Sequence, residues 1–168
     1  EFLGEQLQTL PDQYLDSGLA LDLLYFHTTP LATSAEHHQI EVIDQYAHLP
    51  SEELKALIAK FKDLYLLTDS RDEDHQRLAH DALAPLVIQR YNNSIAKGQR
   101  ARSLLENRIK NSPKESLITL NAADLKTVEA GKEGMRAWLS KEQELVNISR
   151  QSIRRQRLIR NIVLAALI

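Results

Sequence analysis

Apolar residues recur at helical spacing over most of the 168-residue chain, with short polar or proline-containing breaks between the helical stretches. In the first part of the chain this pattern predicts helices over residues 3–10 and 11–26. The second begins at a proline, which is well accommodated in the first turn of a helix. A further helical stretch is expected over residues 36–46. Ser51, followed by two acidic residues, is typical of a helix start and predicts a helix over residues 51–63. The apolar face of that helix consists of Leu54, Leu57, Ile58 and Phe61.

Two short segments after these helices have the length of strands. Residues 64–68 form an apolar run, residues 69–74 form a polar turn, and residues 76–80 are the expected returning strand. Three helices followed by a two-stranded hairpin form a winged helix. The sequence therefore predicts a mainly α fold, with a winged-helix domain and its short two-stranded β-hairpin in residues 1–92, and a helical extension in residues 93–168.

The helical extension is expected to contain three helices. Residues 96–110 have a helical pattern, and residues 140–168 contain no Gly or Pro, which predicts one long helix. Asn121 is suited to cap a helix that ends just before Gly131. Gly131 and Gly134 are expected to loosen the chain. Because a Trp side chain is seldom left wholly in water, the residues expected to pack within the extension are Met135, Trp138 and Leu139.

The net charge of −2 hides an unequal distribution of charge along the chain. Residues 1–80 contain 15 Asp and Glu against 5 Lys and Arg, whereas residues 81–168 contain 8 against 16. The two parts therefore carry net charges of −10 and +8. A split of this size suggests two modules that bind different partners or bind each other.

The composition limits the chemistry that the chain can perform. It contains no cysteine, which excludes disulfides, thiolate catalysis and cysteine-based zinc sites and fits a reducing, cytoplasmic environment. The first residues have neither the basic start nor the long apolar run of a signal peptide. The chain also begins without Met, and we expect it to be part of a longer protein.

His80 and Asp81 lie between the expected returning strand and a helix predicted over residues 81–91. The carboxylate of Asp81 is suited to accept hydrogen bonds from the free amides of the first helical turn. His80 would then be held just outside the helix start, where free amides and a titratable donor suit a phosphate group. The alternative is that His80 is a structural hydrogen-bonding residue.

Residues 78–83, Leu-Ala-His-Asp-Ala-Leu, resemble the MHD segment that closes the winged-helix domain of STAND NTPases, a class of signal-transduction ATPases with bacterial members of the novel STAND type. Ala79 stands in place of the methionine, whereas the His-Asp pair is present. Farther along the chain, residues 98–102, 104–108 and 124–136 are similar to the helical region of bacterial STAND proteins.

The resemblance implies that His80 is a nucleotide-sensing residue and that Asp81 supports the motif. In the family this histidine reaches the ADP phosphate and locks the closed, inactive state. The implied cofactor is ADP or ATP bound in the longer protein. The implied partners are the nucleotide-binding domain of the same chain and further copies in a homo-oligomer. The implied function is a switch that couples nucleotide state to conformational change and assembly in bacterial signalling or antiphage defence.

The chain by itself is not expected to be an enzyme. It contains no phosphate-binding GxxxxGK[ST] motif, no Gly-x-Ser-x-Gly elbow and no cysteine nucleophile, so no catalytic residue is expected, and ATPase activity would belong to the longer protein. His37, His38 and Glu41 lack a third ligand at the fixed spacing of a zinc site. The acidic residues 69–74 lack the glycine and the alternating ligands of a calcium loop. We therefore expect no metal site.

The alternative function is a winged-helix module for protein interaction or DNA binding that is unconnected with any ATPase. A DNA-binding surface must neutralise several phosphates with Lys and Arg. Residues 1–80 carry a net charge of −10, and acidic and basic residues are equal in number in the helix over residues 51–63. DNA is therefore a disfavoured partner. A P-loop upstream in the longer protein would distinguish the two functions.

Five arginines precede an uninterrupted apolar run over residues 162–168. Seven apolar residues cannot span a bilayer, which takes roughly 20, but they suit the start of such a segment with the arginines on its cytoplasmic side. We therefore expect a cytoplasmic protein whose C-terminal helix approaches a membrane. The alternative is a basic helix whose apolar tail packs on the chain itself or on a neighbour. The arginines are Arg150, Arg154, Arg155, Arg157 and Arg160.

Overall fold

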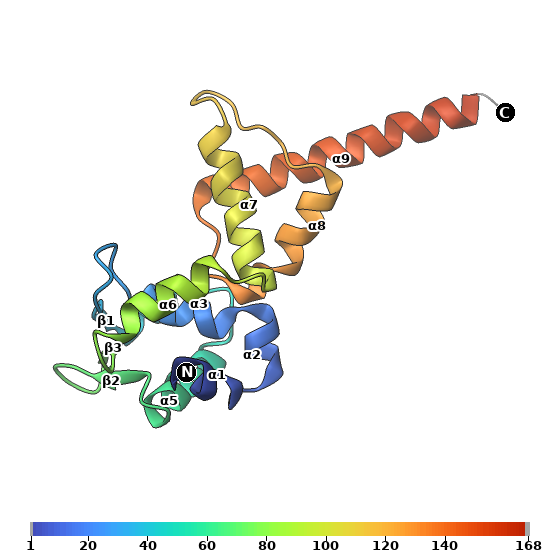
Figure 1. Cartoon of the computed structure of the whole chain (residues 1–168). Coiled ribbons are helices and arrows are strands. Elements are labelled where there is room, and N and C mark those ends of the chain that lie inside the picture. Colours follow the sequence, from blue (N-terminus) through green and yellow to red (C-terminus); the bar gives the residue numbers. More distant parts are fainter. Residues whose placement is uncertain (1, 167–168) are drawn as a thin grey trace.

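The computed structural model describes residues 2–166 and is mainly helical, with a small three-stranded antiparallel sheet (Figure 1). In chain order the elements are α1 (Phe2–Gln8), α2 (Asp12–Ser17), α3 (Leu19–Phe26), β1 (His37–His38), α4 (Gln39–Gln45), α5 (Ser51–Asp63), β2 (Leu67–Asp69), β3 (His75–Leu78), α6 (Leu83–Asn92), α7 (Lys97–Asn111), α8 (Ala122–Ala130), the 3-10 helix η1 (Lys132–Gly134) and α9 (Ser140–Ala166).

The sheet has the strand order β1-β3-β2, with both pairs antiparallel. The predicted hairpin is confirmed, because Leu67 of β2 pairs with Leu78 of β3. The first strand begins later than predicted, since Tyr65 turns the chain with a positive φ of 55°. The third strand, β1, was not predicted: the pattern of residues 36–46 indicated a helix, but His37 and His38 form a strand and the chain becomes helical only from Gln39.

The single helix predicted over residues 11–26 is wrong. Gly18 has a φ of 87°, a left-handed conformation that favours glycine, and it ends α2 and begins α3. The predicted cap at Ser51 is also wrong, because Pro50 is the N-cap residue of α5 and no side chain caps that helix. The apolar face of α5 is confirmed, and its four predicted residues are all buried.

Residues 2–166 contain two separate hydrophobic cores. Both form because each helix buries one apolar face, and each fully buried aliphatic side chain contributes about 1.5–3 kcal/mol. The N-terminal core lies among α1, α3, α5 and α6, and its largest fully buried members include Leu23, Leu24, Tyr46, Phe61 and Leu78. The C-terminal core lies among α7, α8 and α9 and includes Ala101, Leu105, Val128, Met135, Leu145 and Val146.

The segment between α8 and α9 is more tightly packed than predicted. Gly131 and Gly134 do not loosen the chain but are both buried at close backbone contacts. A Cβ atom on Gly134 would overlap the carbonyl oxygen of Ser17, which lies in the other half of the chain. The predicted packing of Met135 and Trp138 against the C-terminal core is confirmed, whereas that of Leu139 is wrong because its side chain is exposed.

The long helix predicted for the C-terminal part is α9, which spans 27 residues. Residues 167 and 168 of the predicted helix lie outside the described residues. Its first turns pack against α7 and α8, and the remainder projects away from the rest of the chain (Figure 1). Among residues 2–166, no helix is both long enough and apolar enough to cross a bilayer.

Candidate functional site

His80 lies in the short segment that joins β3 to α6. Its side chain is exposed, and its backbone carbonyl oxygen accepts a hydrogen bond from the amide of Leu83 at 3.0 Å. The preceding residue is also held, because the amide of Ala79 donates to the carbonyl oxygen of Leu66 at 3.0 Å. The imidazole is therefore exposed to solvent, while backbone hydrogen bonds hold the chain just before and at His80.

Asp81 does not have the predicted role of a helix cap. Ala82 is the N-cap residue of α6, and no side chain caps this helix. Instead, Oδ1 of Asp81 accepts a long hydrogen bond of 3.4 Å from the backbone amide of Ser34. The Ser34 hydroxyl in turn accepts from the amide of Leu78 at 3.0 Å. Asp81 therefore ties the segment around His80 to the loop that precedes β1.

The start of α6 offers fewer free amides than predicted. The amide of Leu83 donates to the carbonyl oxygen of His80, and the amide of Ala84 donates to that of Asp81, both at 3.0 Å. The next residue is Pro85, which has no amide hydrogen. The amides of Leu83 and Ala84 are therefore not free to bind a phosphate and Pro85 has none, whereas the exposed imidazole of His80 stays available as a donor.

Helix α6 connects this segment with the interior of the molecule. It has ten residues and is about 15 Å long at 1.5 Å per residue. Tyr91, in its last turn, stacks on Tyr25 with ring centroids 3.9 Å apart and donates a hydrogen bond of 3.2 Å to Oδ1 of Asp22. His80 thus lies just before one end of α6, and a contact with a buried carboxylate lies at the other end.

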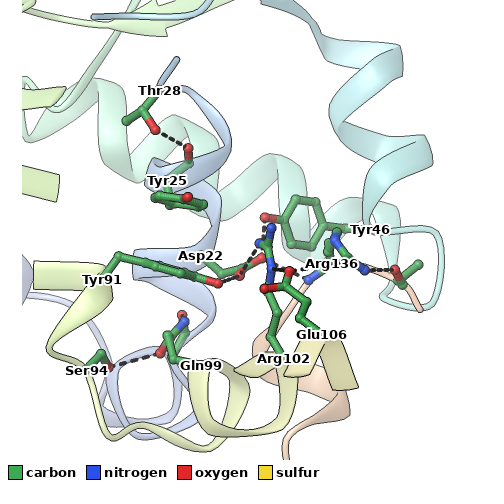
Figure 2. A network of polar contacts seen from close by, with 12 residues as sticks. Asp22, Tyr25, Thr28, Tyr46, Tyr91, Ser94, Gln99, Arg102, Glu106 and Arg136 are labelled. Atoms are coloured by element: carbon green, nitrogen blue, oxygen red, sulfur yellow. Dashed lines mark hydrogen bonds and ion pairs between the residues drawn. The ribbon is translucent and has the colours of Figure 1, made fainter. Parts of the chain in front are cut away.

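Asp22, on α3, is the centre of a buried polar network (Figure 2). Its Oδ2 atom accepts from the Tyr46 hydroxyl at 2.7 Å and from the backbone amide of Arg136 at 2.9 Å. Its Oδ1 atom accepts from the Tyr91 hydroxyl at 3.2 Å and from the Arg102 guanidinium at 3.4 Å. We call these contacts the Asp22 junction, because two of the donors belong to the N-terminal half and two to the C-terminal half of the chain.

Two opposing influences act on the carboxylate at the Asp22 junction. Burial raises the pKa of Asp22, and the hydrogen bond from Tyr46 and the charge of Arg102 oppose that rise. Burial also raises the pKa of Tyr46 well above its ordinary value, so this hydroxyl keeps the proton that it donates. A buried charge is tolerated only when donors or opposite charges compensate for lost water. Here four donors do so.

The contacts around Arg136 extend the junction to α9. The Arg136 guanidinium is almost fully buried and forms two parallel hydrogen bonds, of 2.8 and 2.9 Å, with the carboxylate of Glu142. Glu142 also accepts from the amide of Leu139 at 2.8 Å, just before α9 begins. Such bidentate pairs are strong and fix geometry. Arg136 therefore connects α3 with the start of α9, through its backbone amide on one side and its guanidinium on the other.

A further contact closes the junction on the side of α2. Gln99, buried on α7, donates from Nε2 to the carbonyl oxygen of Gly18 at 2.9 Å. The close approach of Gly134 to the carbonyl oxygen of Ser17, the residue before Gly18, lies beside this contact and also joins the two halves. Polar and backbone contacts, rather than one continuous apolar core, therefore join the two halves.

Sequence reasoning did not single out Asp22 as a functional candidate. One local signal was available: Asp22 lies in the segment Leu-Ala-Leu-Asp-Leu-Leu, with apolar residues on every side. An acidic residue within so apolar a helix must be buried with partners. The partners themselves carry no local signal, because three of the four lie at least 69 positions away in the sequence.

The five predicted arginines lie along α9, and one of them differs from the other four because it forms an ion pair. Arg150 pairs with Glu129 of α8, with 2.6 Å between Nε and Oε1. The other four are exposed, and the packing of α9 places Arg157 and Arg160 in one cleft with Arg108 of α7. These arginines belong to the C-terminal half, whereas His80 belongs to the N-terminal half.

The residues considered for metal binding have structural contacts. His37 Nδ1 lies 3.1 Å from Glu41 Oε2, and its Nε2 lies 3.0 Å from the carbonyl oxygen of Phe26. His38 and Glu41 form a capping box at the start of α4. Within residues 2–166, no three or more His, Asp or Glu residues are grouped as metal ligands.

Comparison with known proteins provides no relative for the chain. No protein-family model matches it, and neither the search of curated proteins nor that of solved structures found a match. The likeness of residues 78–83 to the STAND segment is therefore carried by those residues and the similar stretches after them, and the chain is assigned to no family.

Proposed function

We propose that the chain is the regulatory winged-helix and helical module of a STAND NTPase. In this proposal a nucleotide-binding domain of the same longer protein holds ADP or ATP, and His80 contacts the phosphates of ADP in the inactive state. Loss of that contact changes the arrangement of domains and permits homo-oligomer assembly. The biological setting is bacterial signalling or antiphage defence.

The order of elements supports a winged helix in residues 1–92. Helices α3, α4 and α5 precede the β2–β3 hairpin, and the short strand β1, between α3 and α4, adds to the free edge of β3. In this assignment residues 70–74, between β2 and β3, form the tip of the wing. His80 then follows the last strand of the domain, which is the place that the STAND motif occupies in the resemblance.

Helix α6 is the single observation that carries the proposed coupling. His80 lies just before this helix, and Tyr91 in its last turn donates to Asp22. A short helix moves as a rigid rod because its backbone hydrogen bonds fix its length. A displacement of His80 by a nucleotide would therefore act on the Tyr91 end of α6, and so on the Asp22 junction.

The nature of the Asp22 junction also supports a switch. The two hydrophobic cores are separate, so the halves can move apart without either core being opened. The cost is borne by the hydrogen bonds of Asp22 and by the glycine contacts between the halves. An interface of this kind can have two arrangements that differ by a few kcal/mol, as population-shift mechanisms require.

The surface charge of the proposed winged helix argues against DNA as its partner. The wing tip carries Asp72, Glu73 and Asp74. On α5, Lys55 pairs with Glu52 at 3.0 Å, and Lys62 pairs with Asp69 at 2.6 Å. Phosphate binding would compete with these pairs and with the acidic tip, so we favour contact with another part of the same protein over nucleic acid.

The proposal is tested with His80→Ala in the full-length protein loaded with ADP. Loss of a charge-assisted contact worth about 1.5–3 kcal/mol should increase the assembled or active population by roughly 10-fold or more. Analytical ultracentrifugation measures that population. Arg77→Ala is the control, because Arg77 is an exposed cation on β3, three positions before His80, and its loss should leave assembly unchanged.

The isolated chain provides a second test. It lacks a phosphate-binding loop, so calorimetry should find no more than weak ADP binding and no hydrolysis. Tight ADP binding by the isolated chain would contradict the proposed division of labour. A full-length His80→Ala protein with the same ADP release rate and the same resting assembly as the unmodified protein would contradict the proposed role of His80.

A further inference from the structure

A cleft of about 530 Å³ lies between α9 and the segment that leads into α8. Three guanidinium groups line it, those of Arg108, Arg157 and Arg160. The rest of the lining is made of neutral residues, some with hydrogen-bonding side chains and some apolar, namely Thr119, Asn121, Ser152, Gln156, Leu120, Ala122 and Ile153. Within residues 2–166, no acidic side chain lines this cleft. A concave site with several cations and neutral hydrogen-bonding groups suits a phosphate group.

The positive charge of the cleft is only partly compensated. Arg108 donates to the carboxylate of Asp124 at 3.0 Å and to the carbonyl oxygen of Thr119 at 3.2 Å, so its charge and orientation are fixed. Arg157 and Arg160 form no ion pair within 4.0 Å with any acidic residue among residues 2–166. Two guanidinium groups in the cleft therefore remain available for an anion.

The arginines of the cleft belong to a longer row on α9. Arg150, Arg154 and Arg157 are spaced at i, i+4 and i+7, which places them on one face of the helix. They line a second cleft, of about 580 Å³, together with Lys126 and Glu129 of α8, and Glu129 pairs with Arg150. Arg157 lines both clefts, so the row of arginines continues from the second cleft into the first, where no acidic residue in the described part of the chain compensates for Arg157 and Arg160.

Beyond the row, the character of α9 changes from basic to aliphatic. Ile162, Val163 and Leu164 are between 52% and 67% exposed, on a part of the helix that projects from the molecule (Figure 1). The sequence has no acidic residue after Glu144, and α9 has no aromatic residue. Nucleic-acid surfaces that bind single strands combine basic residues with aromatic side chains for base stacking. An aliphatic surface next to arginines instead matches a phosphate attached to acyl chains.

We propose that the Arg157–Arg160 cleft binds the phosphate of an anionic phospholipid headgroup, with the exposed aliphatic turns of α9 beside the acyl chains. The two free guanidinium groups hold the phosphate oxygens, and Arg108, fixed by Asp124, provides the third side of the cleft. The inference does not depend on the proposed nucleotide switch, because none of its residues belongs to the His80 segment or to the Asp22 junction.

Vesicle flotation of the whole chain tests the inference. Vesicles of phosphatidylcholine with added phosphatidylglycerol should carry the chain upward in the gradient, whereas pure phosphatidylcholine vesicles should not. The double variant Arg157→Gln/Arg160→Gln should lose about 10-fold or more of its vesicle partitioning, because charge-assisted hydrogen bonds to the phosphate are removed. Circular dichroism should show the same helix content in both proteins, since these side chains are exposed.

A charge-matched variant separates the cleft from net charge. Lys141→Gln/Arg155→Gln also removes two positive charges, but from exposed positions of α9 that line neither cleft. It should keep vesicle partitioning within about 2-fold of the unmodified chain, because long-range charge is screened at moderate salt. Equal losses of partitioning in the two double variants would contradict binding at the cleft. Absence of flotation by the unmodified chain would contradict the assignment of a lipid ligand.

Two further probes distinguish the source of the phosphate. Calorimetry should detect no binding of inorganic phosphate at phosphate concentrations equal to the lipid concentrations at which vesicles bind. A free phosphate makes no contact with the aliphatic turns of α9. Binding of inorganic phosphate without vesicle binding would overturn the lipid assignment. A single-stranded oligonucleotide that displaces the chain from vesicles and binds it more tightly would also overturn that assignment.

Discussion

The Oδ2 atom of Asp22 lies 2.9 Å from the backbone nitrogen of Arg136, 114 positions further along the chain. This hydrogen bond joins α3 of the N-terminal half to the segment that precedes α9. The side chain of the same Arg136 holds Glu142 at the start of α9. The orientation of the long C-terminal helix therefore depends on a carboxylate in the other half of the chain.

We expect Asp22→Ala to destabilise the chain strongly. The Tyr46 hydroxyl and the Arg136 amide would lose their buried acceptor, at a cost of about 1–3 kcal/mol each. Urea unfolding followed by circular dichroism measures the loss. Tyr91→Phe is the matched control, because it removes one 3.2 Å hydrogen bond but keeps the stacking on Tyr25, and it should cost about 0.5–1.5 kcal/mol. Equal effects of the two variants would contradict the central position of Asp22.

We expect Gly134→Ala to disturb the contact between the halves. Its added methyl group would overlap the backbone carbonyl of Ser17, which cannot move by a rotamer change. The free energy of unfolding should fall by about 3 kcal/mol, the upper end of the range that is typical of overpacking. Gly4→Ala is the control, because its methyl group would meet only the flexible end of Arg90. The free energy of unfolding of the control should stay within about 1 kcal/mol of the unmodified chain.

The buried Asp22 should give an unusual dependence of stability on pH. Burial raises its pKa above the ordinary 3.8, so the folded chain binds this proton at higher pH than the unfolded chain does. The contribution of Asp22 to the free energy of unfolding is therefore fully present below pH 3.8 and is lost as pH rises through the folded-state pKa. The difference between the unmodified chain and Asp22→Asn should fall with rising pH. A difference that rises with pH would mean that the four donors outweigh burial.

His27 should give a dependence of the opposite sign. It is fully buried, its Nδ1 lies 2.9 Å from the carbonyl oxygen of Leu23, and burial lowers its pKa from 6.5 to about 4. Between pH 4 and 6.5 His27 is protonated in the unfolded chain but neutral in the folded chain. The contribution of His27 is thus present above pH 6.5, and about 3 kcal/mol of it is lost as pH falls to 4.

Unfolding of His27→Leu over this pH range checks that expectation. The variant should show a flatter profile than the unmodified chain between pH 6.5 and 4, whatever its stability at neutral pH. His48→Ala is the comparison, because burial also lowers the pKa of the half-buried His48, and it should flatten the profile less. A His27→Leu profile parallel to that of the unmodified chain would contradict the assignment.

Features that depend on neighbouring residues were predicted from the sequence. The hairpin was recognised from an apolar run, a polar turn and a return, and the cap of α8 from Asn121, whose Oδ1 accepts from the amide of Asp124 at 2.8 Å. The apolar face of α5 was recognised from spacing alone. Where partners lie three or four positions apart, the sequence already contains both of them.

Features that depend on distant residues were decided only by the tertiary structure. The left-handed φ of Gly18 divides one long predicted helix into two, and the partner that binds its carbonyl oxygen, Gln99 of α7, lies 81 positions later. The role of Asp81 was mispredicted, since its carboxylate turns to Ser34, 47 positions earlier, instead of to the next helical turn.

The sequence by itself determined most of the helical segments, the hairpin, the position of His80 before a helix and the row of arginines on the C-terminal helix. It did so because helix and hairpin formation are governed by local periodicity and turn chemistry. The tertiary structure alone decided that Asp22 is the acceptor for both halves and that Arg157 and Arg160 share a cleft with Arg108. These arrangements follow from how α3, α7 and α9 pack, and such long-range contacts leave no periodic trace in the chain.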